Sequence, residues 1–455
     1  MGTVARTRAL LLIGVLAPAA SFGGQAREAL QRAAVLVEAG RLAEADQEAQ
    51  RALSDPVTRA AACSVLGAIR LQQDRPAEGV KLLQEAIRLE PRLVGAQLNL
   101  AEGLLLLATD SLKRGDMSSA TAIVEDSKRL PDVPPAWSVR FAEVLVRGGL
   151  VAEGIDVLER TRKTDPSSYE LAFALGGAYV VKGDPTRALE AYDAALAAKP
   201  ASVAALRQAA IVAEKQGELE RSLSYWMRAR KVAASDPEIL LGFGRVCLKM
   251  DLLDDAEGAL VEAAGQKPGE PAYQYTLAVA KVGKRQYEAA QALLEPLVKQ
   301  KPADAQLQYA LGSVLYMQGL LPDAAARLQE SLRLDAGQLA SPYYLAIVAR
   351  DQGRDAEAIQ GLETLLVRYP DHAASCEALG GLLMNVRRYD EAERLLRKAV
   401  ELNPKSVKGN YQLGLLLART GRREEADKQL AMAKSLREED DKTSRLQLRL
   451  LDPEG

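Results

Sequence analysis

Residues 305–338 read AQLQYALGSVLYMQGLLPDAAARLQESLRLDAGQ, and residues 339–372 read LASPYYLAIVARDQGRDAEAIQGLETLLVRYPDH. Both stretches have 34 residues, with a small residue at the eighth and the twentieth place. Gly319 and Gly353 occupy the fifteenth place, between two segments in which apolar residues recur every three to four positions. This spacing predicts two amphipathic helices joined by a short turn in each stretch.

The same pattern recurs along almost the whole chain, so internal repetition decides the fold. Ten consecutive units follow one another in steps of 34 residues, two more precede them, and seven extra residues separate the second unit from the third. The units start at Ala26, Ala60, Ala101, Pro135, Tyr169, Val203, Pro237, Pro271, Ala305, Leu339, Ala373 and Val407.

Two places in the unit carry small residues, as expected where two helices cross closely. The eighth place is always Ala or Gly: Ala33, Gly67, Ala108, Ala142, Gly176, Ala210, Gly244, Ala278, Gly312, Ala346, Gly380 and Gly414. The twentieth place is Ala or Gly in every unit except one, which has Ser222. A larger side chain at a crossing would push the backbones apart, at a cost of roughly 1–3 kcal/mol. The seventh and twenty-fourth places are mostly large and apolar, and we expect them to fill the space beside the small residues.

Turn residues fall between the expected helices. The fifteenth place is often glycine, which ends a helix in the left-handed conformation. The thirty-second place is often proline, as in Pro302 and Pro370, and proline stops a helix before the next unit. The seven extra residues amount to about two helical turns, so we expect a lengthened first helix in the third unit. Residues 439–451 have a charged side and leucines on the other, which predicts a polar capping helix and tail over 439–455.

This pattern resembles the tetratricopeptide-repeat (TPR) family, and the resemblance covers residues 26–438. It implies an all-α, right-handed superhelical solenoid of about twelve helix–turn–helix repeats over 25–438, with the first helix of each repeat lining a concave groove. The aromatic residue of the family at the fourth place is missing, and Cys63, Leu240 or Asn410 stands there instead.

Composition narrows the function. Charged residues make up 26% of the chain and the net charge is -2, so the sequence lacks the basic character of a nucleic-acid binder. Cys63, Cys247 and Cys376 are far apart and occupy interior places, so we expect buried thiols rather than disulfides or metal ligands. No metal or cofactor is expected.

The N-terminus has the pattern of an export signal. Arg6 and Arg8 precede an apolar run over 9–16, and small residues such as Ala19 and Ser21 follow it. We therefore expect a cleaved signal peptide over 1–24 and a periplasmic or secreted protein. No other segment approaches transmembrane length, so we expect no membrane span in the mature chain.

The resemblance implies that places two, five, nine, twelve and thirteen face the groove. The fifth place is tyrosine in three consecutive units, and Tyr316 occupies a twelfth place. A tyrosine ring with a polar tip suits peptide contacts, although packing between neighbouring repeats explains the tyrosines equally well. A mixed charged patch on Arg207, Glu214, Lys215, Arg245 and Lys249 fits either an acidic segment or a solvated face. The candidate groove residues are Tyr275, Tyr309, Tyr316, Tyr343 and Arg245.

The sequence contains no catalytic motif. Its only histidine, His372, follows a proline in a turn, where we expect it to be exposed and inert. We therefore expect a non-enzymatic protein-binding scaffold that holds segments of a partner polypeptide. Two alternatives stay open, an accessory subunit of an envelope machine for polysaccharide or outer-membrane protein, and a non-catalytic subunit of an enzyme complex. Self-association also stays open.

Overall fold

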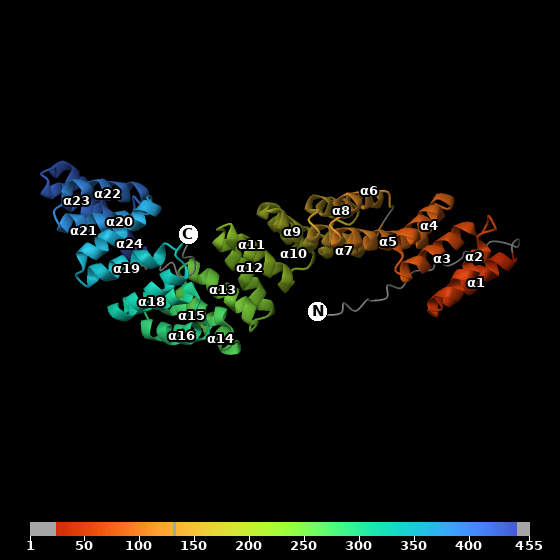
Figure 1. Ribbon diagram of the computed structural model, residues 1–455, viewed down its shortest axis with the longest axis horizontal. Helices are drawn as coiled ribbons and strands as arrows, with labels where there is room; N and C mark the ends of the chain where they lie inside the picture. Colours follow the sequence, from red (N-terminus) through yellow and green to blue (C-terminus); the bar gives the residue numbers. More distant parts are fainter. Residues whose placement is uncertain (1–23, 131–132, 444–455) are drawn as a thin grey trace. The chain divides into compact units, whose positions relative to one another are not determined.

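The computed structural model describes residues 24–130 and 133–443, which form twenty-four α-helices and no strand (Figure 1). The first twelve are α1 Gly24–Glu38, α2 Leu42–Ala52, α3 Arg59–Gln72, α4 Pro76–Leu89, α5 Val94–Lys113, α6 Met117–Ser127, α7 Pro135–Arg147, α8 Val151–Thr164, α9 Tyr169–Lys182, α10 Pro185–Ala198, α11 Val203–Lys215 and α12 Leu219–Val232. The second twelve are α13 Pro237–Lys249, α14 Leu253–Gln266, α15 Pro271–Gly283, α16 Tyr287–Gln300, α17 Ala305–Met317, α18 Leu321–Leu334, α19 Ala340–Asp351, α20 Asp355–Arg368, α21 Ala373–Asn385, α22 Tyr389–Leu402, α23 Val407–Arg419 and α24 Arg423–Thr443.

The helices pair in the order that the period predicts. In eleven repeats an odd-numbered helix packs on the even-numbered helix that follows it, as α3 does on α4 and α21 on α22 (Figure 1). In the sixth repeat Ser222 of α12 hydrogen-bonds the backbone of α11. The predicted fold class, all-α with about twelve helix–turn–helix repeats, is confirmed. The chain divides into two compact units, one up to Tyr225 and one from Trp226.

The first helix of the third repeat is lengthened, as expected. Helix α5 has 20 residues where most first helices have 13 or 14, and it starts at Val94, seven residues before the position that the register gives. The predicted capping helix lies mostly outside the described residues. Helix α24 continues without interruption to Thr443, so its last residues belong to the second helix of the twelfth repeat.

The small residues of the eighth place meet the large residues of the twenty-fourth place within the same repeat. A Cβ atom added to Gly380 would lie 2.7 Å from Leu396 Cγ, and one added to Gly176 would lie 2.5 Å from the Tyr192 ring. The serine exception at the twentieth place also has a reason, because the Ser222 hydroxyl donates a hydrogen bond of 2.8 Å to the backbone oxygen of Ala210. The space where the two helices cross therefore accommodates glycine or alanine, and also a serine whose hydroxyl has a hydrogen-bond acceptor.

The fifteenth place takes the left-handed conformation in every repeat. Eight repeats have glycine with positive φ there: Gly40, Gly115, Gly149, Gly183, Gly217, Gly319, Gly353 and Gly421. The other four have Asp74, Asp251, Arg285 and Arg387, with φ between 59° and 64°. The turn geometry therefore holds even where the sequence offers no glycine, at a cost in backbone strain for the two arginines.

This strain gives a prediction. Arg387→Gly should raise the local unfolding free energy of α21 and α22 by about 1 kcal/mol, because glycine adopts φ near 62° without a Cβ clash. Gly353→Ala should lower the stability of α19 and α20 by a similar amount. An added Cβ at Gly353 would meet nothing within 4 Å, so its effect would come from the backbone alone. Native-state hydrogen exchange measures both changes, and equal protection in the two variants would contradict the strain.

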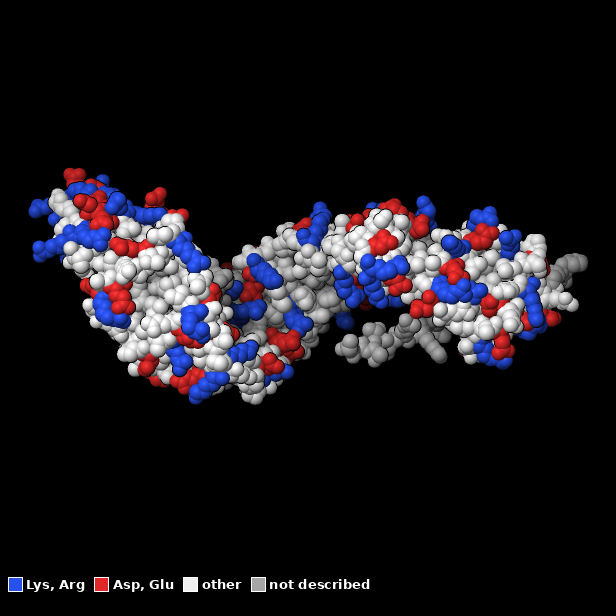
Figure 2. All heavy atoms as spheres, in the orientation of Figure 1, with Lys and Arg blue, Asp and Glu red and all other residues white. Residues whose placement is uncertain are grey.

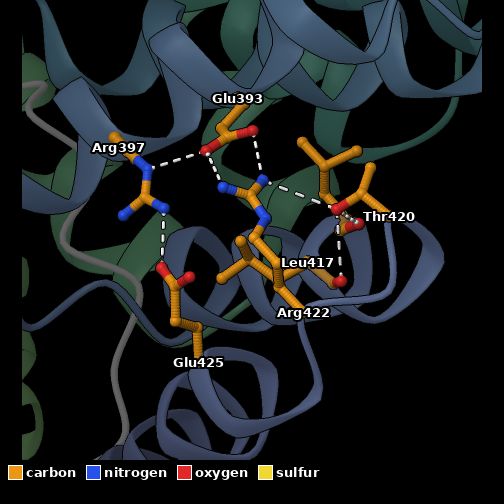
Figure 3. Close-up of polar contacts among 7 residues, drawn as sticks. Glu393, Arg397, Leu417, Thr420, Arg422 and Glu425 are labelled. Atoms are coloured by element: carbon orange, nitrogen blue, oxygen red, sulfur yellow. Dashed lines mark hydrogen bonds and ion pairs between the residues drawn. The ribbon is translucent and has the colours of Figure 1, made fainter.

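Polar contacts between successive repeats involve the twenty-first place. Figure 3 shows Glu393 of α22 accepting hydrogen bonds from Arg422, in the turn between α23 and α24, and from Arg397 Nε at 2.9 Å. Arg397 also bonds Glu425 of α24 at 2.8 Å. Hydrogen bonds from Arg422, with a smaller contribution from Arg397, hold the pKa of Glu393 below its usual value. The same place supplies inter-repeat contacts elsewhere: Asp46 with Arg70, Glu257 with Lys281, and Gln291 with Gln318.

Side chains at the fourth place form hydrogen bonds to the backbone, which the sequence pattern did not predict. Three amide side chains donate to the carbonyl of a proline in the preceding loop: Gln97 to Pro91, Gln308 to Pro302, and Asn410 to Pro404. A fourth, Gln274, donates instead to the Ala264 carbonyl of α14 at 3.1 Å. Gln97 is fourth when α5 is counted from its true start at Val94. An amide at this place therefore gives the loop carbonyl a hydrogen-bond donor.

Candidate functional site

The predicted tyrosines lie on three successive first helices in the C-terminal unit. Tyr275 is on α15, Tyr309 and Tyr316 are on α17, and Tyr343 is on α19. Tyr309 is only 2% exposed, so this tyrosine packs between neighbouring helices rather than facing solvent. The other three are half-buried and keep part of their surface in contact with solvent.

A further tyrosine, Tyr344, lies at the centre of the cluster. Its ring centroid is 5.9 Å from that of Tyr309, 5.8 Å from that of Tyr316 and 5.5 Å from that of Tyr343, all in tilted or edge-on orientations. These separations are typical of favourable aromatic pairs. The groove positions that the family resemblance implies do not include Tyr344, because it occupies the sixth place. Two adjacent tyrosines at 343–344 are the sequence feature that could have pointed to it.

Hydrogen bonds to the neighbouring repeat hold two of the hydroxyl groups. Tyr316 donates to Asp351 at 2.8 Å, and Gln306 Nε2 donates to the Tyr275 hydroxyl at 3.2 Å. Burial, together with the hydrogen bond to Asp351, raises the pKa of Tyr316 to about 12. Burial likewise raises the pKa of Tyr343 and Tyr344. The hydroxyl groups therefore stay protonated at neutral pH and remain hydrogen-bond donors.

A pocket of about 680 Å³ opens beside this cluster. Tyr309, Tyr343 and Tyr344 form one wall, and the turn between α20 and α21 forms another with Tyr369 and His372. This volume lies in the range of ligand pockets, and the lining combines four tyrosines with small or apolar residues and a few polar groups.

The end of α20 fixes the loop between α18 and α19 at the pocket edge. The Tyr369 hydroxyl donates to the backbone oxygen of Gly337, and Arg368 Nη1 donates to that of Ala336 at 2.6 Å. The Arg368 guanidinium also lies 5.4 Å from the Tyr369 ring centroid. Neighbouring repeats are thus tied together at the pocket, which keeps its walls in place.

The expectation that His372 is exposed is wrong. The residue is the N-cap of α21 and is half-buried. Its Nδ1 lies 2.6 Å from the Ser375 hydroxyl, and its ring is edge-on to that of Tyr343, with centroids 5.4 Å apart. The turn at the end of this repeat therefore lies against α19, the first helix of the same repeat.

A family model described as tetratricopeptide repeat matches residues 139–203, 207–271, 275–338, 343–406 and 377–435, more than half of the chain. The chain is a tetratricopeptide-repeat protein. Tetratricopeptide repeats generally serve as protein-binding scaffolds.

Two curated proteins are similar to parts of this TPR chain. The uncharacterised protein y4yS of Sinorhizobium fredii (strain NBRC 101917 / NGR234) is 33% identical over 104 residues, which are 23% of this chain and 57% of that protein. The human protein O-mannosyl-transferase TMTC3 is 26% identical over 117 residues, 26% of this chain and 13% of that protein. The chain thus spans less than two thirds of the length of either relative.

Among solved structures, a tetratricopeptide repeat protein from Parabacteroides merdae is similar over 55% of this chain and 98% of its own. The two are 16% identical, with a TM-score of 0.45.

The TPR stack does not bring all the candidate residues to the pocket. Tyr275 and Arg245 do not line it, and Tyr316 reaches it only through Tyr344. Arg245 is half-buried on α13, while Arg207 and Glu214 of the proposed charged patch lie on α11 in the other unit. On the face drawn in Figure 2, Lys and Arg lie among Asp and Glu over both units.

The three cysteines have the environment that the repeat pattern predicts. Cys63, Cys247 and Cys376 are all buried and form no disulfide. Burial raises the pKa of the Cys247 thiol to about 12, so it stays protonated and packs as a small apolar side chain. Within the described part of the chain, no helix combines the length and the apolar character needed to cross a membrane.

Proposed function

We propose that this TPR protein is a non-catalytic scaffold that binds an extended segment of a partner polypeptide, with the aromatic pocket of α17, α19 and the α20–α21 turn as its anchor site. The observation that supports this most is the pocket itself, because it exposes half-buried tyrosine rings beside hydrogen-bond donors. Tyrosine is enriched where proteins bind peptides, since one rigid ring supplies both apolar area and a polar tip.

Contacts within the protein hold the side chains of the pocket walls. The Tyr344 ring packs against three other tyrosines, and Tyr369 is tied to the preceding loop. Binding therefore costs less conformational entropy than it would if these side chains had to be immobilised by the partner.

A selection of phage-displayed random peptides on the purified chain tests this proposal. Peptides that bind the wild type should bind Ala374→Trp at least about tenfold more weakly, because Ala374 lines the pocket and an indole would fill it. Tyr343→Ala should have the same effect by removing one wall. The control Tyr411→Ala removes a tyrosine of α23 that is 51% exposed and lies outside the pocket. An empty selection, or equal binding by wild type and Ala374→Trp, would overturn the proposal.

We also propose that the protein is exported and acts in the periplasm or outside the cell. The support is the basic start, apolar run and small residues of 1–24, of which 1–23 lie outside the described residues. The N-terminal sequence of the protein recovered from the cell envelope tests this, and an uncleaved start at Met1 in a cytoplasmic fraction would contradict it. A measured turnover by the purified chain alone would contradict the non-catalytic role.

A further inference from the structure

The residues that line the pocket indicate which side chains a bound segment would carry. We propose that the pocket takes an apolar or aromatic side chain of an extended peptide, and that Arg368 pairs with an acidic side chain adjacent to that anchor in the peptide. This inference rests on the proposed function and specifies its partner.

Arg368 is the one Lys or Arg among the described residues that line the pocket. One guanidinium nitrogen bonds a backbone carbonyl and the group lies beside the Tyr369 ring, yet among the described residues no carboxylate lies within ion-pair distance of it. The side chain is exposed at the rim, so its remaining N–H groups face solvent. An arginine held in this way is well placed to donate to a carboxylate.

The nearby carboxylates are already engaged. Asp371 also lines the pocket, but its oxygen lies 2.9 Å from Lys398 Nζ. Asp335, in the loop that Arg368 holds, accepts a hydrogen bond of 2.8 Å from the backbone N–H of Gly337. Neither carboxylate forms an ion pair with Arg368, so its guanidinium remains able to pair with an acidic side chain that lies beside an apolar anchor.

The walls explain why the anchor is apolar. Tyr309, Tyr343 and Tyr344 present ring surfaces, and burial keeps the Tyr343 and Tyr344 hydroxyls un-ionised. A charged side chain inside this cavity would lose its hydration without an opposite charge to replace it. The acidic group therefore belongs at the rim and the apolar group in the cavity.

Pairs of fluorescein-labelled peptides from the selection test the inference by anisotropy titration. Each pair differs only in an Asp or Glu beside the anchor residue, replaced by Asn or Gln in the second member. The wild type should bind the acidic member about fivefold more tightly at low salt, a preference that should shrink as salt is raised.

Arg368→Gln removes the charge but keeps a donor for the Ala336 carbonyl. It should abolish the preference, which is the ratio of the affinities of the two peptides of a pair measured on the same variant. Arg354→Gln is the matched control, because Arg354 is exposed at the start of the same helix and pairs with Glu357 outside the pocket. This control should keep the preference.

The outcomes separate the two proposals. Peptides that lose binding in Ala374→Trp but show no acidic preference would overturn the pairing with Arg368 and leave the proposed function standing. A preference that persists in Arg368→Gln would also overturn it. Equal binding by free phosphate and by the acidic peptide in competition would show an anion site without a peptide anchor, which contradicts the inference. An empty selection would overturn both proposals.

Discussion

Gly176→Ala should lower the local unfolding free energy of α9 and α10 by roughly 1–3 kcal/mol, although alanine is the better helix former. The added methyl would lie 2.5 Å from the Tyr192 ring, which is only 2% exposed and cannot move into solvent without leaving the core. Backbone separation or rotation of the ring would follow, and both disturb a close-packed crossing.

The next residue in the helix provides the control. Gly177→Ala places its methyl no closer than 4.0 Å from the Tyr192 hydroxyl, in the same helix and with the same chemical change. It should be neutral or stabilising by up to about 1 kcal/mol, from helix propensity alone. Hydrogen exchange of α9 and α10 amides compares the two variants locally, which suits a repeat array because its repeats can unfold separately. Similar changes in both variants would show that the eighth place is not sterically restricted.

Leu396→Ala should have the largest effect of any substitution considered, a loss of about 2–5 kcal/mol from the repeat of α21 and α22. Leu396 is fully buried on α22 and fills the space beside Gly380, so its truncation leaves a cavity. Leu402→Ala, in the same helix, removes a side chain that is 40% exposed and should cost much less.

A double variant tests whether Leu396 and Gly380 are complementary in size. Gly380→Ala alone should destabilise, because its Cβ would lie 2.7 Å from Leu396 Cγ. In the Leu396→Ala background the same change should cost little or restore stability, since the methyl enters the vacated space. Additive effects in urea unfolding or hydrogen exchange would contradict direct packing between the two places.

Much of the fold follows from the sequence because each feature repeats. The small residues at the eighth place recur in every unit. Six of them are glycines, and each packs against the large residue at the twenty-fourth place of its own repeat, as Gly312 does against Leu328. The lengthened α5 was also predictable, since a two-turn insertion keeps the apolar side in register.

Other features depend on contacts that no single repeat contains. From the sequence, the amide at the fourth place indicates only that the family aromatic is missing. Its hydrogen bond could not be predicted, because the acceptor lies in the preceding loop.

The candidate site was predictable only in part. The tyrosine period led to Tyr309 and Tyr343, which do line the pocket. Tyr369 and His372 come from the turn at the end of the same repeat as Tyr343, and the direction of a turn side chain is set by the neighbour on which it packs. Tyr275 also occupies the fifth place, but it does not line the pocket. The turn between α20 and α21, which forms one pocket wall, belongs to a repeat two units further along the chain.

Hydrogen exchange of the full chain, with and without a selected peptide, tests the binding site most directly. We predict that the peptide protects the amides of α19 around 340–346 and of the turn and helix start at 369–376, and that Ala374→Trp removes this protection. Protection confined to α1–α12, or protection that survives in Ala374→Trp, would contradict the assignment of the aromatic pocket as the partner-binding site.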